Sequence, residues 1–352
     1  MKATLRSLLK MLFFLLFGLT ILWFLYRDLN ASYLAECVSK GIPEAECSLV
    51  DKVIADFRAT HIFWLIVICF CFFLSNVSRS LRWQQLIQSM GYNTKWANAF
   101  HCVMLGYFAN LGLPRMGEVI RAATFTRYEV IPFEKVMGTV VVDRIIDLIC
   151  LSLVFLLALL LQFDLLWQFI VDNANFSFSD VLFSPLFLIA FIALLILLIL
   201  GWNYRSRLAG ISFFQRLQRA ASGFAEGLKS LRKVENKPRL ILHSINIWLM
   251  YYLMTFLCFR AFDPTAHLGP LAGLLVFVFG SLGMIIPTPG GMGSYHALVI
   301  AALVLLGINQ NDAFSFAMII FFTINIFGNI LFGIIALILL PNQNRNYQPV
   351  RV

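Results

Sequence analysis

Charged residues are scarce in this sequence. Asp, Glu, Lys and Arg make up 13% of its 352 residues, about half of the ~25% that is usual in soluble globular proteins. Hydrophobic residues make up 60%, so too few polar side chains remain to cover the surface of a water-soluble fold. This composition excludes a disordered chain, a collagen, a coiled coil and most soluble enzymes.

The sequence also lacks the common signatures of metal and nucleotide binding. It has no Cys-x-x-Cys or Cys/His pattern and no Asp-rich loop of the kind that holds metal ions. Its Gly-rich segment near residue 290 lacks the Lys-Ser/Thr that completes a phosphate-binding P-loop. We therefore expect no cofactor and no metal, and nothing in the sequence calls for nucleic acid as a partner.

Long hydrophobic runs are abundant. A helix needs ~20 mostly apolar residues to cross the hydrocarbon core of a bilayer. The clear candidates are residues 8–26, 61–77, 136–161, 182–202, 240–262 and 313–340. The first run is expected to stay as an uncleaved helix, the alternative being a signal peptide. The runs predict an all-α polytopic membrane protein, one integral domain over residues 1–352 with about eight transmembrane helices.

Loop charges predict the orientation, because basic residues gather on the cytoplasmic side. Residues 27–60 hold four Lys/Arg against six Asp/Glu and are expected to form an outer loop. Residues 203–239 hold nine Lys/Arg against two Glu and are expected inside, as is the loop assigned to Arg79, Arg82 and Lys95. The predicted protein is integral to the cell (inner or plasma) membrane, with its two termini in the cytoplasm.

Two further segments do not fit single crossings. The first, residues 98–132, has inner loops on each side and is expected to enter the membrane, turn near Pro114 and Gly117, and return. The second hairpin, residues 269–308, is expected to start and end outside. Its tip carries the helix-breaking residues Pro287, Pro289, Gly290, Gly291 and Gly293. Tight turns at the membrane surface are the alternative.

The two hairpins lie in units of the same design, span–hairpin–span in opposite orientations. These units, residues 61–162 and 240–340, point to an inverted repeat, which in transporters marks a transport site. Between them, residues 207–233 place apolar and basic side chains at helical spacing. This pattern predicts an amphipathic helix held on the inner leaflet by anionic lipids, with a groove on a partner protein as the alternative.

Ionisable residues within hydrophobic runs are costly and are candidates for function. Asp143, Arg144 and Asp147 lie inside the run 136–161, and the two Asp residues share one helical face. At that spacing they repel each other unless a cation lies between them, which Arg144 or Arg121 could supply. A headgroup or ion site and a purely structural ion pair are the two readings.

The residues after each tip are further candidates. Arg115, Glu118 and Arg121 recur along one side of a helix. Guanidinium groups suit phosphate through forked hydrogen bonds, and Glu118 could pair with an amine or hold an Arg in place. His296 follows the second tip, where it could be a proton-linked switch or an ordinary hydrogen-bonded His.

Seven cysteines are present. Five lie in or beside apolar runs, where Cys behaves as a small hydrophobe. Cys37 and Cys47 lie in the predicted outer loop, and a disulfide between them is expected if that side is oxidising. Two unpaired thiols are the alternative.

Four motifs follow one another along the chain. They are Arg79…Arg82-Trp83, Asn110…Leu113-Pro114…Gly117-Glu118…Arg121, Asp143-Arg144…Asp147 and Pro287…Pro289-Gly290-Gly291-Met292-Gly293. Together, over residues 63–338, they resemble the lysylphosphatidylglycerol synthase transmembrane-region family, described as flippase-like integral membrane proteins. The resemblance implies a region that moves a phospholipid across the bilayer. It places around the headgroup Arg115, Glu118, Arg121, Arg144 and Asp147.

The chain departs from that family in two ways. It ends at Val352, so we expect the cytosolic aminoacyl-transferring domain to be absent. Many family members have a Glu shortly after the Gly-rich tip, where this sequence has His296.

The leading hypothesis is a lipid flippase or translocase without a catalytic domain. Its headgroup site would include Asp143 and His296 as well as the residues implied by the resemblance. One alternative is a membrane-embedded transferase acting on a polyprenyl-phosphate or a phospholipid. Another is a non-transporting partner subunit that uses the basic helix.

Overall fold

The computed structural model describes residues 2–39, 41–43, 47–112, 116–163, 234–286, 288 and 291–347. Every regular element in these ranges is a helix, which confirms the predicted all-α fold. The expected span 182–202 and amphipathic helix 207–233 lie outside the described residues, as do Pro114, Arg115, Pro287, Pro289 and Gly290. The total of about eight spans therefore stays a prediction.

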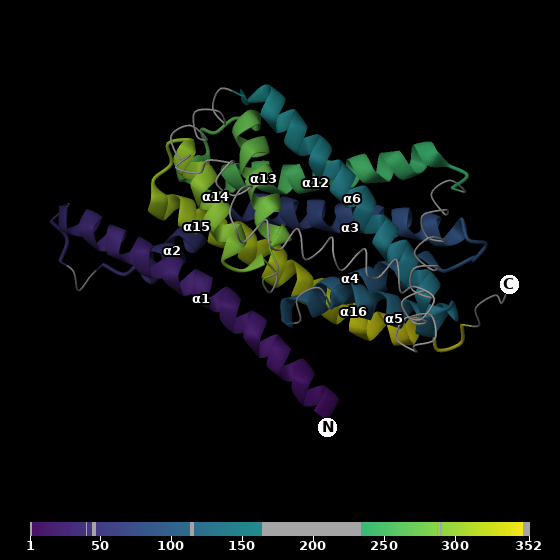
Figure 1. Ribbon diagram of the computed structural model, residues 1–352. Helices are drawn as coiled ribbons and strands as arrows, with labels where there is room; N and C mark the ends of the chain where they lie inside the picture. The colour runs from purple at the N-terminus through teal and green to yellow at the C-terminus, as the bar shows by residue number, and fades with distance from the viewer. Residues whose placement is uncertain are drawn as a thin grey trace, which may run out of the picture.

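The helices follow one another along the chain as Figure 1 labels them. They are α1 (Lys2–Ser39), α2 (Leu49–Ala59), α3 (Ile62–Gln88), α4 (Trp96–Gly112), α5 (Gly117–Glu129), α6 (Phe133–Leu161), α12 (Lys237–Ala261), α13 (Pro270–Ile285), α14 (Ser294–Leu305), α15 (Gln310–Phe321) and α16 (Asn329–Gln343). A short 3-10 turn, η2 (Asp263–Thr265), follows α12, and a π-helical segment, η4 (Phe322–Gly328), joins α15 to α16.

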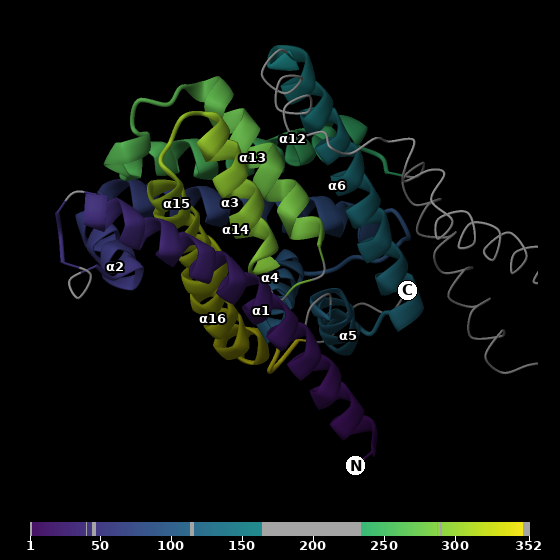
Figure 2. The same cartoon turned by 60° about the vertical axis from the view of Figure 1, so that its left-hand side comes forward.

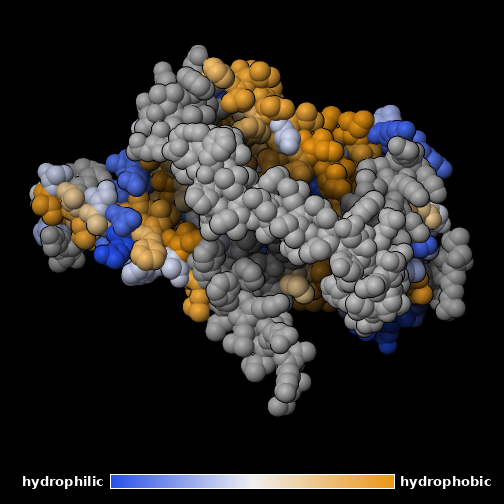
Figure 3. Space-filling model, in the orientation of Figure 1, coloured by the Kyte–Doolittle hydropathy of each residue, from blue (hydrophilic) through white to orange (hydrophobic). Residues whose placement is uncertain are grey.

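Four of the described helices are long and apolar enough to cross a membrane. They are α3, α6, α12 and the continuous helix Gln310–Gln343, which contains α15, η4 and α16. In Figures 1 and 2, α3 and α12 lie side by side, and they pack together closely. Among the coloured residues of Figure 3, hydrophobic ones gather between hydrophilic patches at the left and right ends of the visible face. This distribution fits an integral membrane protein.

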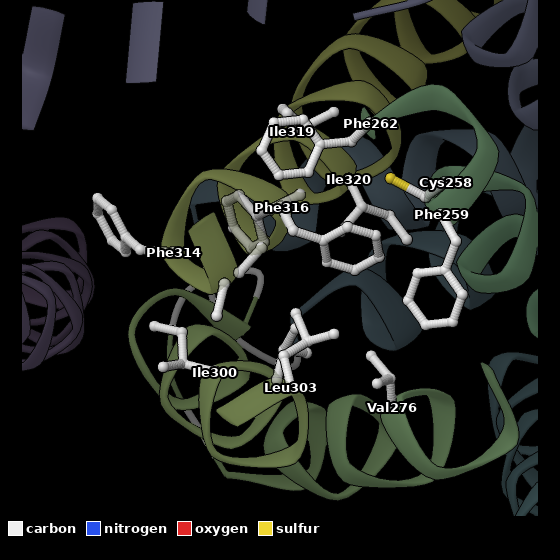
Figure 4. Packing of buried hydrophobic residues seen from close by; sticks show 14 of the residues in the cluster. Cys258, Phe259, Phe262, Val276, Ile300, Leu303, Phe314, Phe316, Ile319 and Ile320 are labelled. Carbon is white, nitrogen blue, oxygen red and sulfur yellow. The ribbon is translucent and has the colours of Figure 1, made fainter. Parts of the chain in front are cut away.

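An apolar core joins α12 to the second hairpin and to α15. Phe259 of α12 and Phe316 of α15 pack with their ring centres 5.2 Å apart, and each side chain is fully buried. Val276 of α13 and Leu303 of α14 line the other side of the same cluster (Figure 4). A second cluster, which includes Trp83 of α3, surrounds the first hairpin.

Each expected hairpin is a pair of adjacent helices. α4 packs against α5, and α13 packs against α14. At the base of the first pair, Asn98 Nδ2 and Tyr347 Oη donate to the carboxylate of Glu129 at 2.6 and 2.9 Å. The C-terminal tail is therefore tied to the open end of the α4–α5 hairpin.

The predicted outer segment, residues 27–60, is mostly helical: α1 continues to Ser39, and α2 buries Leu49 and Val53. Its placement outside the membrane stays a prediction. One expectation about loops is wrong. Arg79 and Arg82 are not in a loop, because α3 continues past residue 77 to Gln88 and buries them among ion-pair partners. The inner placement of the loop after α3 therefore loses two of the three basic residues on which it was based.

Candidate functional site

The first hairpin is held together by a close crossing of its two helices. A Cβ added to Gly117 would collide with the backbone carbonyl oxygen of Gly106 and would lie 2.6 Å from Asn110 Oδ1. That Asn oxygen accepts a hydrogen bond from the Gly117 backbone N–H at 2.8 Å. Glycine is therefore required at Gly117, and the close approach brings Glu118 and Arg121 of α5 against α4.

Asp143 and Asp147 share one face of α6, as predicted from their spacing. The cations between them come chiefly from α3. Arg82 Nη2 lies 2.7 Å from Asp143 Oδ1 and 2.6 Å from Asp147 Oδ1. Arg79 Nη1 lies 2.7 Å from Asp147 Oδ2 and 3.4 Å from Asp143 Oδ2. Asp143 is fully buried, so these guanidinium groups replace the water that its charge would otherwise need.

Arg121 completes this arrangement from α5. Its Nη1 donates to Asp143 Oδ2 at 3.1 Å, and its guanidinium carbon lies 3.8 Å from the centre of the Trp83 ring. The residue is 4% exposed, yet its Nε and Nη2 have no hydrogen-bond partner in the described part of the chain. Arg79, Arg82, Arg121, Asp143 and Asp147 are called the Arg–Asp cluster below.

Arg144 and Glu118 form a second, more exposed pair beside the cluster. Arg144 Nη2 donates to Glu118 Oε1 at 2.5 Å, and 41% of the Arg144 side chain is exposed. The second carboxylate oxygen, Glu118 Oε2, is buried without a partner among the described residues. Arg144 also lies 3.6 Å from Asp147, so the pair is continuous with the Arg–Asp cluster.

A small cavity separates Arg121 from the Arg144–Glu118 pair. It measures about 10 Å³, which is room for about one water molecule. Its wall includes Tyr107, Asn110, Gly117, Glu118, Arg121 and Arg144. We call it the Arg121 cavity.

Among the described residues, the local charge does not cancel. Four guanidinium groups, those of Arg144 and of the three cluster arginines, face three carboxylates, those of Asp143, Asp147 and Glu118. The net charge of +1 is confined to a region between apolar helices. Since buried charges are normally compensated, this excess favours an anion in the Arg121 cavity.

The second tip is built differently. Gly291 and Gly293 have φ angles of 81° and 84°, which only glycine adopts without strain, so the chain breaks where it was predicted to. His296 is 1% exposed and packs against Phe321, with ring centres 4.6 Å apart. Its Nδ1 accepts a hydrogen bond from the Gly293 N–H at 3.4 Å. These contacts place His296 within the α13–α14–α15 packing, and none of them involves the Arg–Asp cluster.

Four residues have contacts in the site that were not predicted. Arg79 and Arg82 were predicted only as motif and loop residues, although their i, i+3 spacing puts them on one helical side. Tyr107 and Tyr251 were not singled out: Arg79 Nη2 donates to Tyr251 Oη at 3.2 Å, and the two phenol oxygens lie 3.4 Å apart. A single Tyr in an apolar run gives no signal by itself, so only the packing of α3, α4 and α12 could reveal them.

Metal-ligating side chains do not gather in the part of the chain that is described. No group of three or more His, Cys, Asp or Glu lies close enough there to hold an ion. Cys37 and Cys47 are joined by a disulfide that links the end of α1 to the start of α2.

These features define a class: an all-α integral membrane protein with a buried, positively charged cluster between helices. A family model described as the lysylphosphatidylglycerol synthase TM region matches residues 48–332. The chain therefore belongs to that family.

Relatives have been found in Methanocaldococcus jannaschii. The UPF0104 membrane protein MJ1078 is 28% identical over 251 residues, which cover 68% of this chain and all of the relative. The UPF0104 membrane protein MJ1595 is 34% identical over 101 residues, which cover 28% of this chain and 30% of the relative. No solved structure matches the chain.

Proposed function

We propose that this protein binds the phosphate of a membrane lipid at the Arg121 cavity and moves the lipid between the two leaflets. The observation that carries the proposal is Arg121 itself, a buried guanidinium with two nitrogen atoms, Nε and Nη2, that have no partner among the described residues. Those donors are the ones that a phosphate oxygen would accept from. A phosphodiester carries one negative charge, which balances the local excess of +1.

The cavity must widen before a headgroup can enter, because about 10 Å³ holds about one water molecule. The Arg144–Glu118 pair is the gate in this proposal. It is the more exposed ion pair of the site, so separating it costs less than breaking the fully buried contacts of Asp143. Once open, Arg144 turns to the phosphate, and Glu118 accepts from an amine on headgroups that have one.

The lengths of the hairpin helices support a site at membrane depth. α5 has 13 residues and α14 has 12, which span about 20 Å and 18 Å at 1.5 Å per residue. A complete crossing of the hydrocarbon core needs ~30 Å. These lengths agree with re-entrant hairpins that meet inside the bilayer. An inverted repeat, in which α3 and α12 are the corresponding spans before each hairpin, is part of the same proposal.

The orientation is part of the proposal. The surplus of Lys and Arg in residues 203–239 supports two cytoplasmic termini in a cell membrane, with anionic lipids at the basic segment 207–233. A tag at the C-terminus should then resist protease added outside intact cells and be lost after permeabilisation. Digestion of the tag in intact cells would reverse the orientation.

The central test is lipid movement in vesicles of phosphatidylcholine that contain a fluorescent phospholipid. Reconstituted protein should speed transfer of the label between leaflets, and Arg121→Gln should slow it strongly. Arg127→Gln is the matched control, because Arg127 lies on the same helix but is exposed. Arg121→Lys keeps the charge opposite Asp143 but loses the forked donors, so its rate should fall between the two.

Equal rates for Arg121→Gln and the unaltered protein would overturn the proposal. If Arg121→Gln fails to fold, the Arg121→Lys result still decides, because the proposal requires a measurable loss of rate when the fork is removed.

A further inference from the structure

A second, much larger pocket lies between α1, α2 and α15, away from the residues of the Arg121 cavity. Its volume is about 830 Å³, which is within the ~300–1,000 Å³ of ordinary small-molecule sites. Apart from Arg58, Tyr26 and Trp23, its lining side chains are entirely hydrophobic. We call it the α1–α2 pocket.

The walls of this pocket are fixed to one another. The Cys37–Cys47 disulfide joins the end of α1 to the start of α2. Lys52 Nζ of α2 donates to Asp312 Oδ1 of α15 at 2.7 Å, and Phe57 packs edge-on against Phe322 with ring centres 5.9 Å apart. These contacts hold the three helices in place, so the pocket is a fixed part of the fold.

The pocket opens towards the surroundings of the protein. Trp23 is 54% exposed, Ile54 44% and Phe322 43%. In water such a contiguous apolar surface would be unfavourable, whereas in a bilayer hydrocarbon chains cover it. The family and the four spanning helices place the protein in that second environment.

One cation lies at the pocket. Arg58, near the end of α2, is exposed and makes no ion pair in the described part of the chain. Trp23 and Tyr26 are of the residue types that collect at the headgroup level of membranes. The guanidinium of Arg27, next to Tyr26 on α1, lies 5.9 Å from the Trp23 ring centre. The hydrophobic lining of the α1–α2 pocket is complementary to an acyl chain. The Arg58 guanidinium and the interfacial aromatic residues are complementary to the phosphate attached to that chain.

We propose that the α1–α2 pocket is a second lipid site, which holds an acyl chain of a membrane phospholipid while Arg58 contacts its phosphate. The occupant is a lipid chain rather than a helix of another protein. Helices pack in membranes through small residues that let backbones approach, but large side chains such as Trp23, Phe57, Phe314 and Phe322 line this pocket. The site is independent of the translocation proposed for the Arg121 cavity.

The test is photolabelling of the full-length protein in detergent micelles. The probe is a phosphatidylcholine with a diazirine in its acyl chain, and labelled peptides are mapped by mass spectrometry. Labelling should concentrate on α1, α2 and α15, saturate with probe concentration, and be displaced by unlabelled phosphatidylcholine. This result is required of the unaltered protein. The proposal is overturned if labelling of these helices does not saturate, or if it is no stronger than labelling of the exposed face of α12.

Two variants sharpen the result. Val53→Trp fills the pocket and should reduce the saturable labelling severalfold, whereas the same change at Val304, which is 45% exposed on α14, should leave it unchanged. Arg58→Gln should weaken binding of the phospholipid probe by about fivefold, the equivalent of one hydrogen bond. It should not alter labelling by a diazirine diacylglycerol, which has no phosphate.

Equal loss with the two probes would overturn the role of Arg58. Crosslinks from α1 and α2 to a second copy of the chain, in place of lipid, would overturn the choice of occupant. None of these readouts depends on lipid movement, so failure here and failure of the translocation test are separate results.

Discussion

The two hairpins share a construction but differ in chemistry. Each brings its helices together at glycines: Gly117 lies against Gly106 in the first, and in the second Gly283 lies against the backbone of Ser294 and Tyr295. The sequence of α5 includes Glu118, Arg121, Arg127 and Glu129, while α13 and α14 contain no Asp, Glu, Lys or Arg.

That difference separates two tasks. The second hairpin buries apolar side chains against α12 and α15, and its histidine, His296, is enclosed there. The first hairpin positions Arg121 beside Asp143 and leaves two of its donors without a partner among the described residues. In the proposed function, the charged residues on the returning helix, rather than the tip itself, distinguish the hairpin that binds the anion.

The largest expected effect on stability comes from removing the carboxylate of Asp143, which lies beside the first hairpin. Asp143→Asn leaves Arg79, Arg82 and Arg121 without their shared counter-charge, and breaking such a buried pair costs about 3–5 kcal/mol. Thermal unfolding in detergent should show the loss as a much lower midpoint.

The matched change in the second hairpin is Ser294→Ala, which removes a hydrogen bond from Ser294 Oγ to the Gly283 carbonyl at 2.8 Å. It should cost only about 0.5–1.5 kcal/mol. A loss for Asp143→Asn no greater than that for Ser294→Ala would mean that the Arg–Asp cluster does not hold the helices together.

The next largest effect on stability concerns the glycines at which the helices of each hairpin meet. Gly117→Ala places a methyl group against backbone atoms of α4 and should cost about 1–3 kcal/mol through forced separation of the helices. Gly280→Ala should cost less, because its nearest neighbour is the movable Tyr295 ring, 2.9 Å away.

Gly112→Ala is the control for the glycine pair, since nothing lies within 4 Å of the added carbon. Unfolding midpoints of the three variants, measured side by side, give the order. Equal midpoints for Gly117→Ala and Gly112→Ala would show that α4 and α5 can separate without cost.

A smaller effect concerns ligand binding. Arg121→Gln should weaken binding of a phospholipid to the purified protein by about tenfold, because at least one charge-assisted hydrogen bond is lost. His296→Gln should leave affinity within about twofold, since His296 contacts Gly293, Tyr295 and Phe321 instead. Native mass spectrometry with phosphatidylglycerol measures the two affinities. A larger loss for His296→Gln would move the site to the second hairpin.

The smallest effect concerns the tail at the base of the first hairpin. Burial and the hydrogen bond to Glu129 raise the pKa of Tyr347 to about 12, above the ~10 of an unfolded chain. The neutral phenol is thus favoured in the folded state, and its contribution is complete below pH 10 and lost between about pH 10 and 12. Tyr347→Phe should lower the unfolding midpoint slightly at pH 7, and the two proteins should converge as the pH rises through this range. A constant difference across it would contradict the role of the phenol.

Hydrophobic runs and helix breakers were sufficient to predict much of the fold. The runs at 136–161 and 240–262 became α6 and α12, and the glycines of the second tip have the left-handed backbone that was expected. These features are local, because spanning length and backbone freedom depend on consecutive residues. The helices within residues 27–60 were not predicted, because α2 is partly polar and buries its apolar side only where it packs on α15.

The candidate site was predicted in part. The pairing of Asp143 and Asp147 on one face of a helix follows from their spacing, and the need for a cation between them follows from their charge. Their main partners could not be predicted, because α3 and α6 are separated by α4 and α5 in sequence and a charge pattern does not say which helix packs beside which. His296 looked like Arg121 in sequence, a polar residue after a tip, yet its contacts lie in the apolar packing.

The sequence by itself determined the class of protein and the identity of its rare charges, since a chain with 13% charged residues has few places to put them. Only the tertiary structure decided what those charges do. Packing of α3 against α6 compensates Asp143 and Asp147, and the crossing at Gly117 leaves Arg121 with donors that no side chain in the described part of the chain reaches. The physical reason is that every buried charge needs a counter-charge, whatever its surroundings. Which side chain supplies that counter-charge depends on which helices pack together.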